Sequence, residues 1–569
     1  MPPSSKHASR RTGLWLAIAT VLFVSGWRLW IMAGQRHLLA VAGEIGSFAQ
    51  SKEEMVNEEI VPSGDGHGLV FFRETETGIG TYFLAAASDQ SKLLFEQAEK
   101  GYTGELGFVT WSPEDRFFAC AFKSNSAQAP GRKFVVYDGG SGERVTSIEA
   151  LWDAKFIWLS PHSFAYSRYN QTWLVVGRNP DGKWVQSQTV NRFAVGELKG
   201  LAAVSPHEVA WQEGGEVWIY DLTAGVTAKI WKSTTNQLES FTYAAEVGNF
   251  LLKCRDENGP FSICFRPPRL WDKQGAVLAT IRGDLRTPSV DLHLEQGCYA
   301  FTIITGTNSE PVHFVWDGMV EYYKLAGDYL YFTGNPPNEP PGIWQYNITA
   351  KTARCLASGL KGDLKHTKMV TPKTVTGKNA AGKEMSYHLW EPTHVSPGKK
   401  YPLIIGQAHY MWFSYPQVAA NGRYYFAAAD RLSWWAGLDD WGADVMGLYE
   451  TLAKNPNIDT NRIYLFATSA ESGLLSQLVA EKPDLWRGAI LFNPIAEPDL
   501  SRAHLSRMFI VSGSDDFNPP GQLMKYQDET AKAGIPVRLF FQDGVQHVTR
   551  SIATERERTK QFARFLLEN

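Results

Sequence analysis

The sequence predicts an all-β propeller of about seven blades, followed by a domain in which strands alternate with helices, and preceded by a single N-terminal membrane helix. Three observations lead to this fold class. Residues 67–360 consist of short runs rich in Val, Ile, Tyr, Trp and Thr, separated by Gly, Asn and Asp. After about residue 365, apolar strands alternate with helical stretches. The first 36 residues carry basic side chains and then an apolar run.

The composition is that of a folded protein with more than one domain. The chain has 569 residues, of which 44% are hydrophobic and 13% are aromatic, so it can fill several cores. The formal net charge is only -3, and the chain contains no long basic or acidic block. These values argue against disorder and against a nucleic-acid partner.

The N-terminal segment has the pattern of an export signal. Lys6, Arg10 and Arg11 precede an apolar stretch that has no charged residue until Arg28. A clean cleavage site is missing, so we expect residues 1–36 to be a cytoplasmic basic flank and an uncleaved signal anchor. By the positive-inside rule, the rest of the chain then lies outside the cytoplasm, periplasmic or extracellular, and it is secreted if the signal is removed. The N-terminal run is apolar on all sides and has a basic flank, which argues against a helix buried in a soluble domain.

A weak internal repeat supports the propeller. An apolar strand, a polar turn and a second apolar strand recur, as in "FVTWSPEDRFFACAF", "FIWLSPHSFAYSRY" and "LAAVSPHEVAWQEG". The repeats start about 35 to 48 residues apart, which is typical of propeller blades, and we count seven. Two stacked β-sandwiches are the less favoured alternative. We expect a linker over residues 37–66 and the propeller over residues 67–362.

The five cysteines show no metal-binding or redox spacing. All of them lie between residues 100 and 360, and no C-x-x-C pair occurs. Cys254 and Cys264 flank a predicted hairpin with Asn258 and Gly259 near its tip. They can oxidise across this hairpin or remain two buried thiols, and the sequence leaves both alternatives open.

Residues 363–569 contain three residues whose chain order fits nucleophilic catalysis. A serine hydroxyl needs a base within hydrogen-bond reach, and that base needs a carboxylate to orient it. Ser469, Asp516 and His547 occur in this order, each just after a predicted strand. Asp515 is the fallback for the acid. The carboxyl ends of strands are where an open parallel sheet places its site.

Four segments in this half resemble the prolyl oligopeptidase family of serine peptidases. They are "GKKYPLII", "NIDTNRIYLFATSAES", "VSGSDDFNPP" and "GIPVRLFFQDGVQHV". The propeller half matches this family by architecture only. The resemblance implies an α/β-hydrolase domain with Ser469 as the nucleophile, His547 as the base and Asp516 as the orienting acid. Each of the three stands at the spacing of the family pattern.

The nucleophile segment departs from the family's G-x-S-x-G pattern. Ala467 and Glu471 replace the two glycines, and Ser472 replaces a third. The small residues normally relieve crowding where strand and helix meet in a strained turn. A carboxylate here would also oppose a developing oxyanion. We therefore expect Glu471 to point outward, where its charge suits the start of a helix.

The oxyanion-stabilising groups are less clearly marked. The backbone N–H of Ala470 is one expected donor. A second is expected near Ala408, from the backbone or from the side chain of His409 or Tyr410, in the stretch "GQAHYMWF". These positions are shifted by one or two residues from the family pattern.

These features together predict a membrane-anchored serine peptidase that acts on short peptides, with the propeller limiting access to the site. An esterase is a second interpretation, because a triad alone does not distinguish esters from amides. A non-catalytic propeller scaffold with a decayed hydrolase domain is the third, and the altered glycines favour it. The sequence implies no metal and no organic cofactor.

Overall fold

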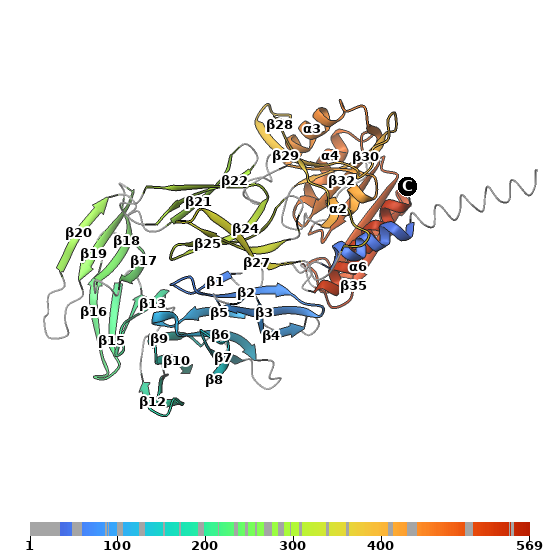
Figure 1. The fold of residues 1–569 in the computed structure, drawn as a ribbon. Coiled ribbons are helices and arrows are strands. Elements are labelled where there is room, and N and C mark those ends of the chain that lie inside the picture. The colour runs from blue at the N-terminus through green and yellow to red at the C-terminus, as the bar shows by residue number, and fades with distance from the viewer. Residues whose placement is uncertain are drawn as a thin grey trace, which may run out of the picture.

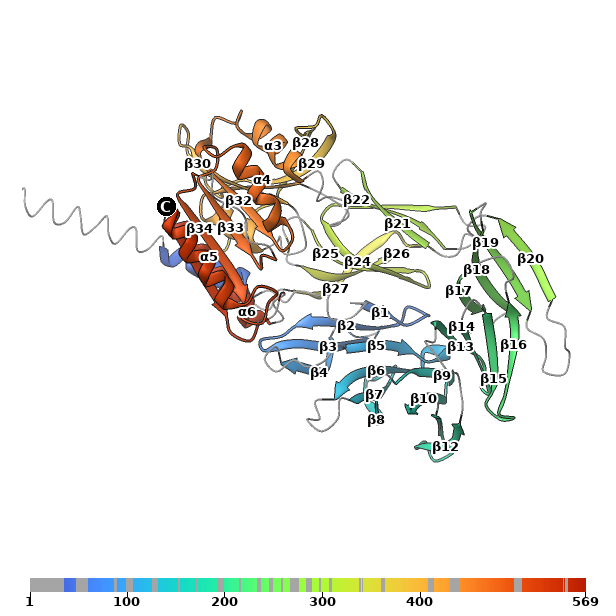
Figure 2. The same cartoon turned by 180° about the vertical axis from the view of Figure 1, so that it is seen from behind.

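The computed structural model describes residues 35–568 apart from gaps, the longer of which are 48–59, 99–105, 125–130, 192–198, 267–275, 283–288, 408–413, 430–440 and 496–503. The described strands form seven small antiparallel sheets and one eight-stranded sheet. Both views place the eight-stranded sheet at one end of the molecule, beside the first and seventh small sheets (Figures 1 and 2).

The seven small sheets follow one another along the chain, and each is a meander of consecutive strands. Six have four described strands and the sixth has three. In chain order the strands are β1 (Ile60–Pro62), β2 (Gly68–Glu74), β3 (Gly78–Ala85) and β4 (Lys92–Ala98); β5 (Leu106–Trp111), β6 (Phe117–Ser124), β7 (Gly131–Asp138) and β8 (Arg144–Leu151); β9 (Phe156–Ser160), β10 (Ser163–Tyr169), β11 (Thr172–Arg178) and β12 (Trp184–Asn191); β13 (Lys199–Ser205), β14 (Glu208–Glu213), β15 (Glu216–Asp221) and β16 (Val226–Lys232); β17 (Gln237–Ala244), β18 (Asn249–Asp256), β19 (Gly259–Arg266) and β20 (Ala276–Arg282); β21 (Ser289–Glu295), β22 (Cys298–Ile304) and β23 (Val312–Trp316); β24 (Met319–Ala326), β25 (Tyr329–Asn335), β26 (Gly342–Asn347) and β27 (Thr352–Ser358).

Among the described residues, apolar side chains join the first five sheets in succession, the sixth sheet to the seventh, and the seventh back to the first. Alternating residues on the strands form separate clusters between successive sheets. A further cluster joins the seventh sheet to the first through Ile60, Phe71, Tyr331 and Ile343. The hydroxyl of Tyr331 also donates a hydrogen bond to the carbonyl oxygen of Gly66. This arrangement confirms the predicted propeller-like architecture of seven sheets.

The repeated Ser-Pro turns have a local explanation. Pro113 opens the short 3₁₀ helix η2 (Pro113–Asp115) between β5 and β6. The hydroxyl of Ser112 accepts a hydrogen bond of 2.9 Å from the N–H of Phe117 and so closes the turn. The side chain of Ser205 accepts one of 3.2 Å from the N–H of His207 in the fourth sheet. The sequence repeat therefore marks the first hairpin of a blade.

The eight-stranded sheet has the order β28-β29-β31-β30-β32-β33-β34-β35. Its first two pairings are antiparallel and the others are parallel, as predicted for alternating strands and helices. The strands are β28 (Lys373–Lys378), β29 (Glu384–Trp390), β30 (Tyr401–Gln407), β31 (Tyr425–Ala429), β32 (Ile458–Thr468), β33 (Gly488–Phe492), β34 (Arg507–Gly513) and β35 (Val537–Gln542). The helices are α2 (Ser414–Asn421), α3 (Trp441–Leu452), α4 (Glu471–Glu481), α5 (Pro520–Lys532) and α6 (Ile552–Leu567).

Helices cover both faces of this sheet. One apolar cluster packs α3, α4 and α5 against alternate strand residues, with Trp441, Leu475 and Tyr526 among its members. The other packs α2 and α6 against the opposite face, with Val418 and Phe562. The central strands are buried on both sides, which explains their nearly continuous apolar sequences.

The N-terminal part of the description corrects the predicted domain boundaries. Residues 35–45 form a helix whose apolar side chains, including Val41 and Ile45, belong to the cluster around α2 and α6. The prediction of a linker over residues 37–66 is therefore wrong for this helix and for β1, which begins at Ile60. Most of the predicted anchor lies outside the described residues, among which no helix is long and apolar enough to cross a membrane.

The predicted hairpin between Cys254 and Cys264 exists as β18 and β19. Its register places Cys254 opposite Phe261 and Cys264 opposite Leu251. The two cysteines are therefore offset by three residue pairs along the hairpin, and at about 3.4 Å per residue this separation is too large for a disulfide.

Candidate active site

The nucleophile segment forms a sharp turn between β32 and α4. Ser469 lies in this turn with a φ of 46°, in the left-handed region that side-chain-bearing residues rarely adopt. Its N–H donates a hydrogen bond of 3.0 Å to the carbonyl oxygen of Phe492 at the end of β33. A strained serine between a strand and a helix is the geometry of a nucleophile elbow.

The structure brings the three predicted catalytic residues together. Ser469 Oγ lies 2.8 Å from His547 Nε2, and His547 Nδ1 lies 2.7 Å from Asp516 Oδ1. The Asp516 side chain is fully buried and that of His547 is 17% exposed. Asp515 is exposed, and its carboxylate accepts a hydrogen bond from Ser514 instead. The fallback acid therefore takes no part in this chain of hydrogen bonds.

Asp516 is held in its ionised form. Burial raises the pKa of its carboxyl group, but the hydrogen bond and charge of His547 and the hydrogen bonds from the Phe517 N–H and Ser512 outweigh burial, so the pKa lies below its usual value. The donor distances from Phe517 and Ser512 are 2.6 and 3.0 Å. An ionised Asp516 fixes the proton of His547 on Nδ1, which leaves Nε2 free to accept a proton from Ser469.

Residues that the sequence analysis missed hold the His547 backbone. Asn493 has a φ of 46°, and its side-chain amide donates a hydrogen bond to the carbonyl oxygen of His547. Arg558 of α6 is fully buried and donates hydrogen bonds to Asn493 Oδ1 at 3.2 Å and to Gln542 Oε1 at 3.0 Å. Asn493 follows β33 at the carboxyl edge of the parallel sheet, which was the available sequence signal.

The propeller meets the other end of the histidine loop. Thr75, in the turn after β2, forms an isolated parallel bridge with Ser551 and accepts a hydrogen bond of 2.8 Å from the Ile552 N–H. The neighbouring Glu76 pairs with Arg556 of α6 at 2.8 Å. The first blade therefore fixes the start of α6, five residues after His547.

Glu471 does not point outward as expected. Its side chain is fully buried, and Oε2 accepts hydrogen bonds from the Thr468 N–H at 2.9 Å and from the Thr468 hydroxyl at 3.2 Å. Oε1 is buried and has no hydrogen-bond partner among the described residues. The carboxyl group folds back on the end of β32 because the N–H of Thr468 needs an acceptor there.

The ionisation state of Glu471 removes the expected conflict with an oxyanion. Burial raises the pKa of Glu471 to about 8, although the two hydrogen bonds from Thr468 act in the opposite direction. At neutral pH the group is therefore mainly protonated and uncharged. A neutral acid beside the nucleophile does not repel negative charge that develops on a substrate carbonyl oxygen.

One of the three predicted oxyanion-stabilising residues can be placed. Ala470 is the N-cap residue of α4, directly after Ser469. The first N–H groups of a helix have no intrahelical acceptor, so the start of α4 offers donors and the positive end of a dipole. His409 and Tyr410 lie in the stretch 408–413, outside the described residues.

Two apolar side chains face solvent beside the triad. Phe517 is 72% exposed, and its ring centroid lies 4.8 Å from that of His547. Ile495 is 41% exposed, and its N–H donates to the carbonyl oxygen of the nucleophile at 3.3 Å. Asn518 joins the two loops through a 2.6 Å hydrogen bond to the Pro494 carbonyl oxygen. The open side of the site is therefore partly apolar.

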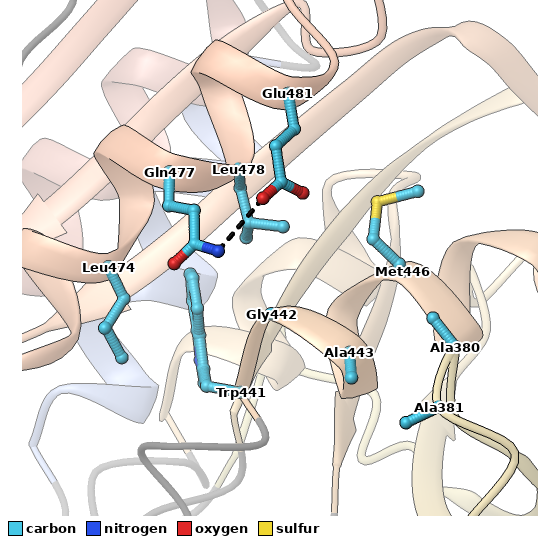
Figure 3. Close-up of a pocket in the computed structure, with 10 residues that line it drawn as sticks. All are labelled: Ala380, Ala381, Trp441, Gly442, Ala443, Met446, Leu474, Gln477, Leu478 and Glu481. Atoms are coloured by element: carbon cyan, nitrogen blue, oxygen red, sulfur yellow. Dashed lines mark hydrogen bonds between the residues drawn. The ribbon is translucent and has the colours of Figure 1, made fainter.

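A separate hollow of about 520 Å³ lies between α3, α4 and the β28–β29 turn, and it contains none of the three predicted catalytic residues (Figure 3). Gln477 donates a hydrogen bond of 2.9 Å to Glu481 on its rim. The residues that line it are Ala380, Ala381, Trp441, Gly442, Ala443, Met446, Leu474, Gln477, Leu478 and Glu481.

Comparisons with known proteins identify the fold. No family model and no curated protein sequence matches the chain. Solved structures do match: a prolyl endopeptidase (TM-score 0.55, 13% identity, 95% of this chain and 94% of that chain) and a puromycin-hydrolysing peptidase from Mycobacterium tuberculosis (0.55, 12%, 93% and 96%). The chain has the prolyl oligopeptidase fold. A third structure with this fold is Porphyromonas gingivalis dipeptidyl peptidase 4 (0.52, 12%, 90% and 97%).

The shared prolyl oligopeptidase fold covers both the propeller and the eight-stranded domain, because the matches span more than nine-tenths of the first two structures and of this chain. At these identities the likeness concerns the fold, and an activity has to be argued from the residues of the site.

Proposed function

We propose that the protein is a serine hydrolase that cleaves short peptides through Ser469, His547 and Asp516. The observation that carries this proposal is the continuous chain of two hydrogen bonds, 2.8 and 2.7 Å long, that links the three side chains beside a strained elbow. The peptidases with this fold support a peptide as the substrate. A peptide must reach a site next to the propeller, which favours short substrates.

The proposed reaction has two steps that balance without a cofactor. Ser469 Oγ attacks the carbonyl carbon while His547 Nε2 takes the hydroxyl proton, and the C–N bond then breaks as His547 returns that proton to the leaving amine. Water next attacks the acyl-enzyme, again with His547 as base and then as acid. Asp516 keeps the imidazole oriented, and the Ala470 N–H stabilises the oxyanion.

The decisive experiment is labelling with a fluorophosphonate probe. Wild-type protein should form a covalent adduct at Ser469, and the adduct should disappear in Ser469→Ala and in His547→Ala. Ser506→Ala, in the segment before β34, is the matched control and should label like wild type. If the wild-type protein is folded by circular dichroism but takes no probe and cleaves no activated substrate, the proposal is wrong.

A non-catalytic scaffold is the second candidate function. The observation that favours it is the replacement of the elbow glycine by the buried Glu471. The same labelling experiment separates the two candidates, because a scaffold requires no reactive serine. An esterase would label as a peptidase does, so matched ester and amide substrates are needed to distinguish those two activities.

The proposal includes a location. The basic flank and apolar run of residues 1–36 would anchor the chain, with the propeller and the hydrolase domain outside the cytoplasm. The protein should sediment with membranes, and added protease should digest the two domains in intact cells or opened envelopes. A full-length product found only in the soluble cytosolic fraction would contradict this location.

A further inference from the structure

The sixth propeller sheet gathers three potential metal ligands on one face. His293 and Glu295 lie two residues apart on β21, so their side chains project to the same side. His313 projects from β23, two strands across the sheet. One donor atom of each residue lies within 4.8 Å of the donor atoms of the other two.

The strand register explains why side chains from the two outer strands converge. On β22, Ala300 pairs with His293, and Thr302 pairs with His313. Ala300 is fully buried and has only a methyl group. The small residues of the middle strand leave room above it for the longer side chains of β21 and β23 to meet.

This face differs from the other side of the same sheet. Tyr299, Phe301 and Ile303, which alternate with Ala300 and Thr302, pack into the apolar cluster shared with the seventh sheet. Apolar clusters join the other adjacent sheets, but among the described residues no such cluster joins the fifth sheet to the sixth. The histidine face is therefore turned away from the seventh sheet and carries polar groups.

We propose that His293, Glu295 and His313 bind one divalent transition-metal ion of the zinc class. Two imidazoles and one carboxylate are a donor set that zinc prefers, with water in the fourth position. His313 Nε2 already lies 2.9 Å from Glu295 Oε2. Zinc ligands lie about 2 Å from the ion, so small side-chain rotations bring all three donors within reach.

A simple ion pair explains less of this arrangement. A pair needs only His313 and Glu295, yet the ring of His293 lies with its centroid 6.0 Å from that of His313. His293 Nδ1 is shielded from solvent and makes no hydrogen bond among the described residues. Its nearest carboxylate, Asp291 Oδ2, is 3.8 Å away. His293 supplies a second nitrogen donor close to the pair, and thus the third ligand that a metal site requires.

This site could not be predicted from sequence spacing, because the two histidines are 20 positions apart and match no common zinc spacing. Only the register of β21, β22 and β23 brings them together. The ion would crosslink the two outer strands of the sixth sheet and would not touch the triad. The proposal is therefore independent of the proposed peptidase activity.

The test is a zinc titration of the purified full-length protein. The protein is treated with a chelator and desalted, and zinc sulfate is then added in competition with a chromophoric chelator. We expect one equivalent of zinc to bind, and we expect binding to weaken more than about tenfold in His313→Gln and in Glu295→Gln. The thermal midpoint of the wild type should rise with zinc.

His207→Gln, at an exposed turn between β13 and β14, is the matched control and should bind zinc like wild type. The substituted ligands are partly exposed, so the variants should fold, and circular dichroism checks this. Two results would overturn the proposal: a wild-type protein that binds no zinc, or a His293→Gln/His313→Gln double variant that binds as many equivalents as wild type with unchanged affinity.

Discussion

Two buried carboxyl groups flank the histidine and serine of the proposed triad, and they differ in charge. The Asp516 side chain is fully buried beside His547, and Glu471 is fully buried beside Ser469. The pKa of Asp516 lies below its usual value, whereas burial raises that of Glu471 to about 8. Burial alone therefore does not decide whether an acid in this site is ionised.

The difference lies in the donors around each group. Asp516 receives hydrogen bonds on both oxygens, from Ser512 on one and from His547 and the Phe517 N–H on the other. Glu471 receives hydrogen bonds on one oxygen only, both from Thr468. Hydrogen bonds to both oxygens stabilise the ionised form of a buried acid, whereas a buried oxygen without a donor favours the protonated form. In the proposed reaction the charged Asp516 orients His547, and the neutral Glu471 does not repel the oxyanion.

The largest expected effect follows from removing the charge at Asp516. Asp516→Asn keeps the shape, but its amide cannot accept the Nδ1 proton in the same way, so His547 is no longer held in the tautomer that accepts a proton from Ser469. We expect turnover of an activated substrate to fall by about 10⁴-fold, the effect of such a change in serine proteases. Steady-state kinetics measures this.

Asp515→Asn is the matched control, because it makes the same substitution one position earlier on the same loop. Asp515 is exposed and does not touch His547. The turnover of the Asp515→Asn variant should therefore stay within about twofold of wild type, as is usual for surface substitutions. If the two variants lost activity equally, the assignment of the ionised acid to Asp516 would fail.

Asp516 and the two residues linked to it could be predicted from the sequence. Chain order and spacing identified Ser469, Asp516 and His547, because each follows a strand of a parallel sheet whose carboxyl ends meet at one edge. The seven propeller sheets followed from the repeat. The sequence did not predict Asn493 or Arg558, whose contacts to the histidine loop depend on how α6 packs on the sheet.

The prediction for the orientation of Glu471 was wrong. Glu471 was expected to point outward because a carboxylate at the elbow would oppose a developing oxyanion and because its charge suits the start of a helix. The structure instead buries it, since the Thr468 N–H at the end of β32 takes Glu471 Oε2 as its acceptor. The N-terminal helix at residues 35–45 was missed for a similar reason: its apolar positions become visible as a packing face only beside α2 and α6.

Neutralising Glu471 permanently should change the pH dependence of stability. In the unfolded chain this group loses its proton near pH 4.5, but in the folded protein it keeps the proton until about pH 8. Folding therefore takes up a proton between these values, and the free energy of unfolding falls as the pH rises through this window. The full difference corresponds to on the order of 5 kcal/mol.

Glu471→Gln cannot titrate and keeps an acceptor for Thr468. We expect this variant to match wild type near pH 4 and to become progressively more stable than wild type up to about pH 8, by urea denaturation at each pH. Glu481→Gln, on the exposed end of the same helix, should follow the wild-type curve. Parallel curves for Glu471→Gln and wild type would show that Glu471 ionises at its ordinary pKa.

The smallest expected effect concerns the substrate side of the Asp516 loop. The backbone N–H of Phe517 donates a hydrogen bond to Asp516. Phe517→Ala should therefore keep that hydrogen bond and remove only the exposed ring beside His547. Loss of an apolar contact to substrate costs about 1–3 kcal/mol, so kcat/KM for peptides with a large apolar side chain near the scissile bond should fall about tenfold or more, mainly through KM. Peptides with only glycine there should be cleaved as before.

Met524→Ala is the matched control, because it removes a similarly exposed apolar side chain from α5; it should change kcat/KM for neither kind of peptide. If Phe517→Ala lost activity equally on both kinds of peptide, the ring would position His547 and would not contact the substrate.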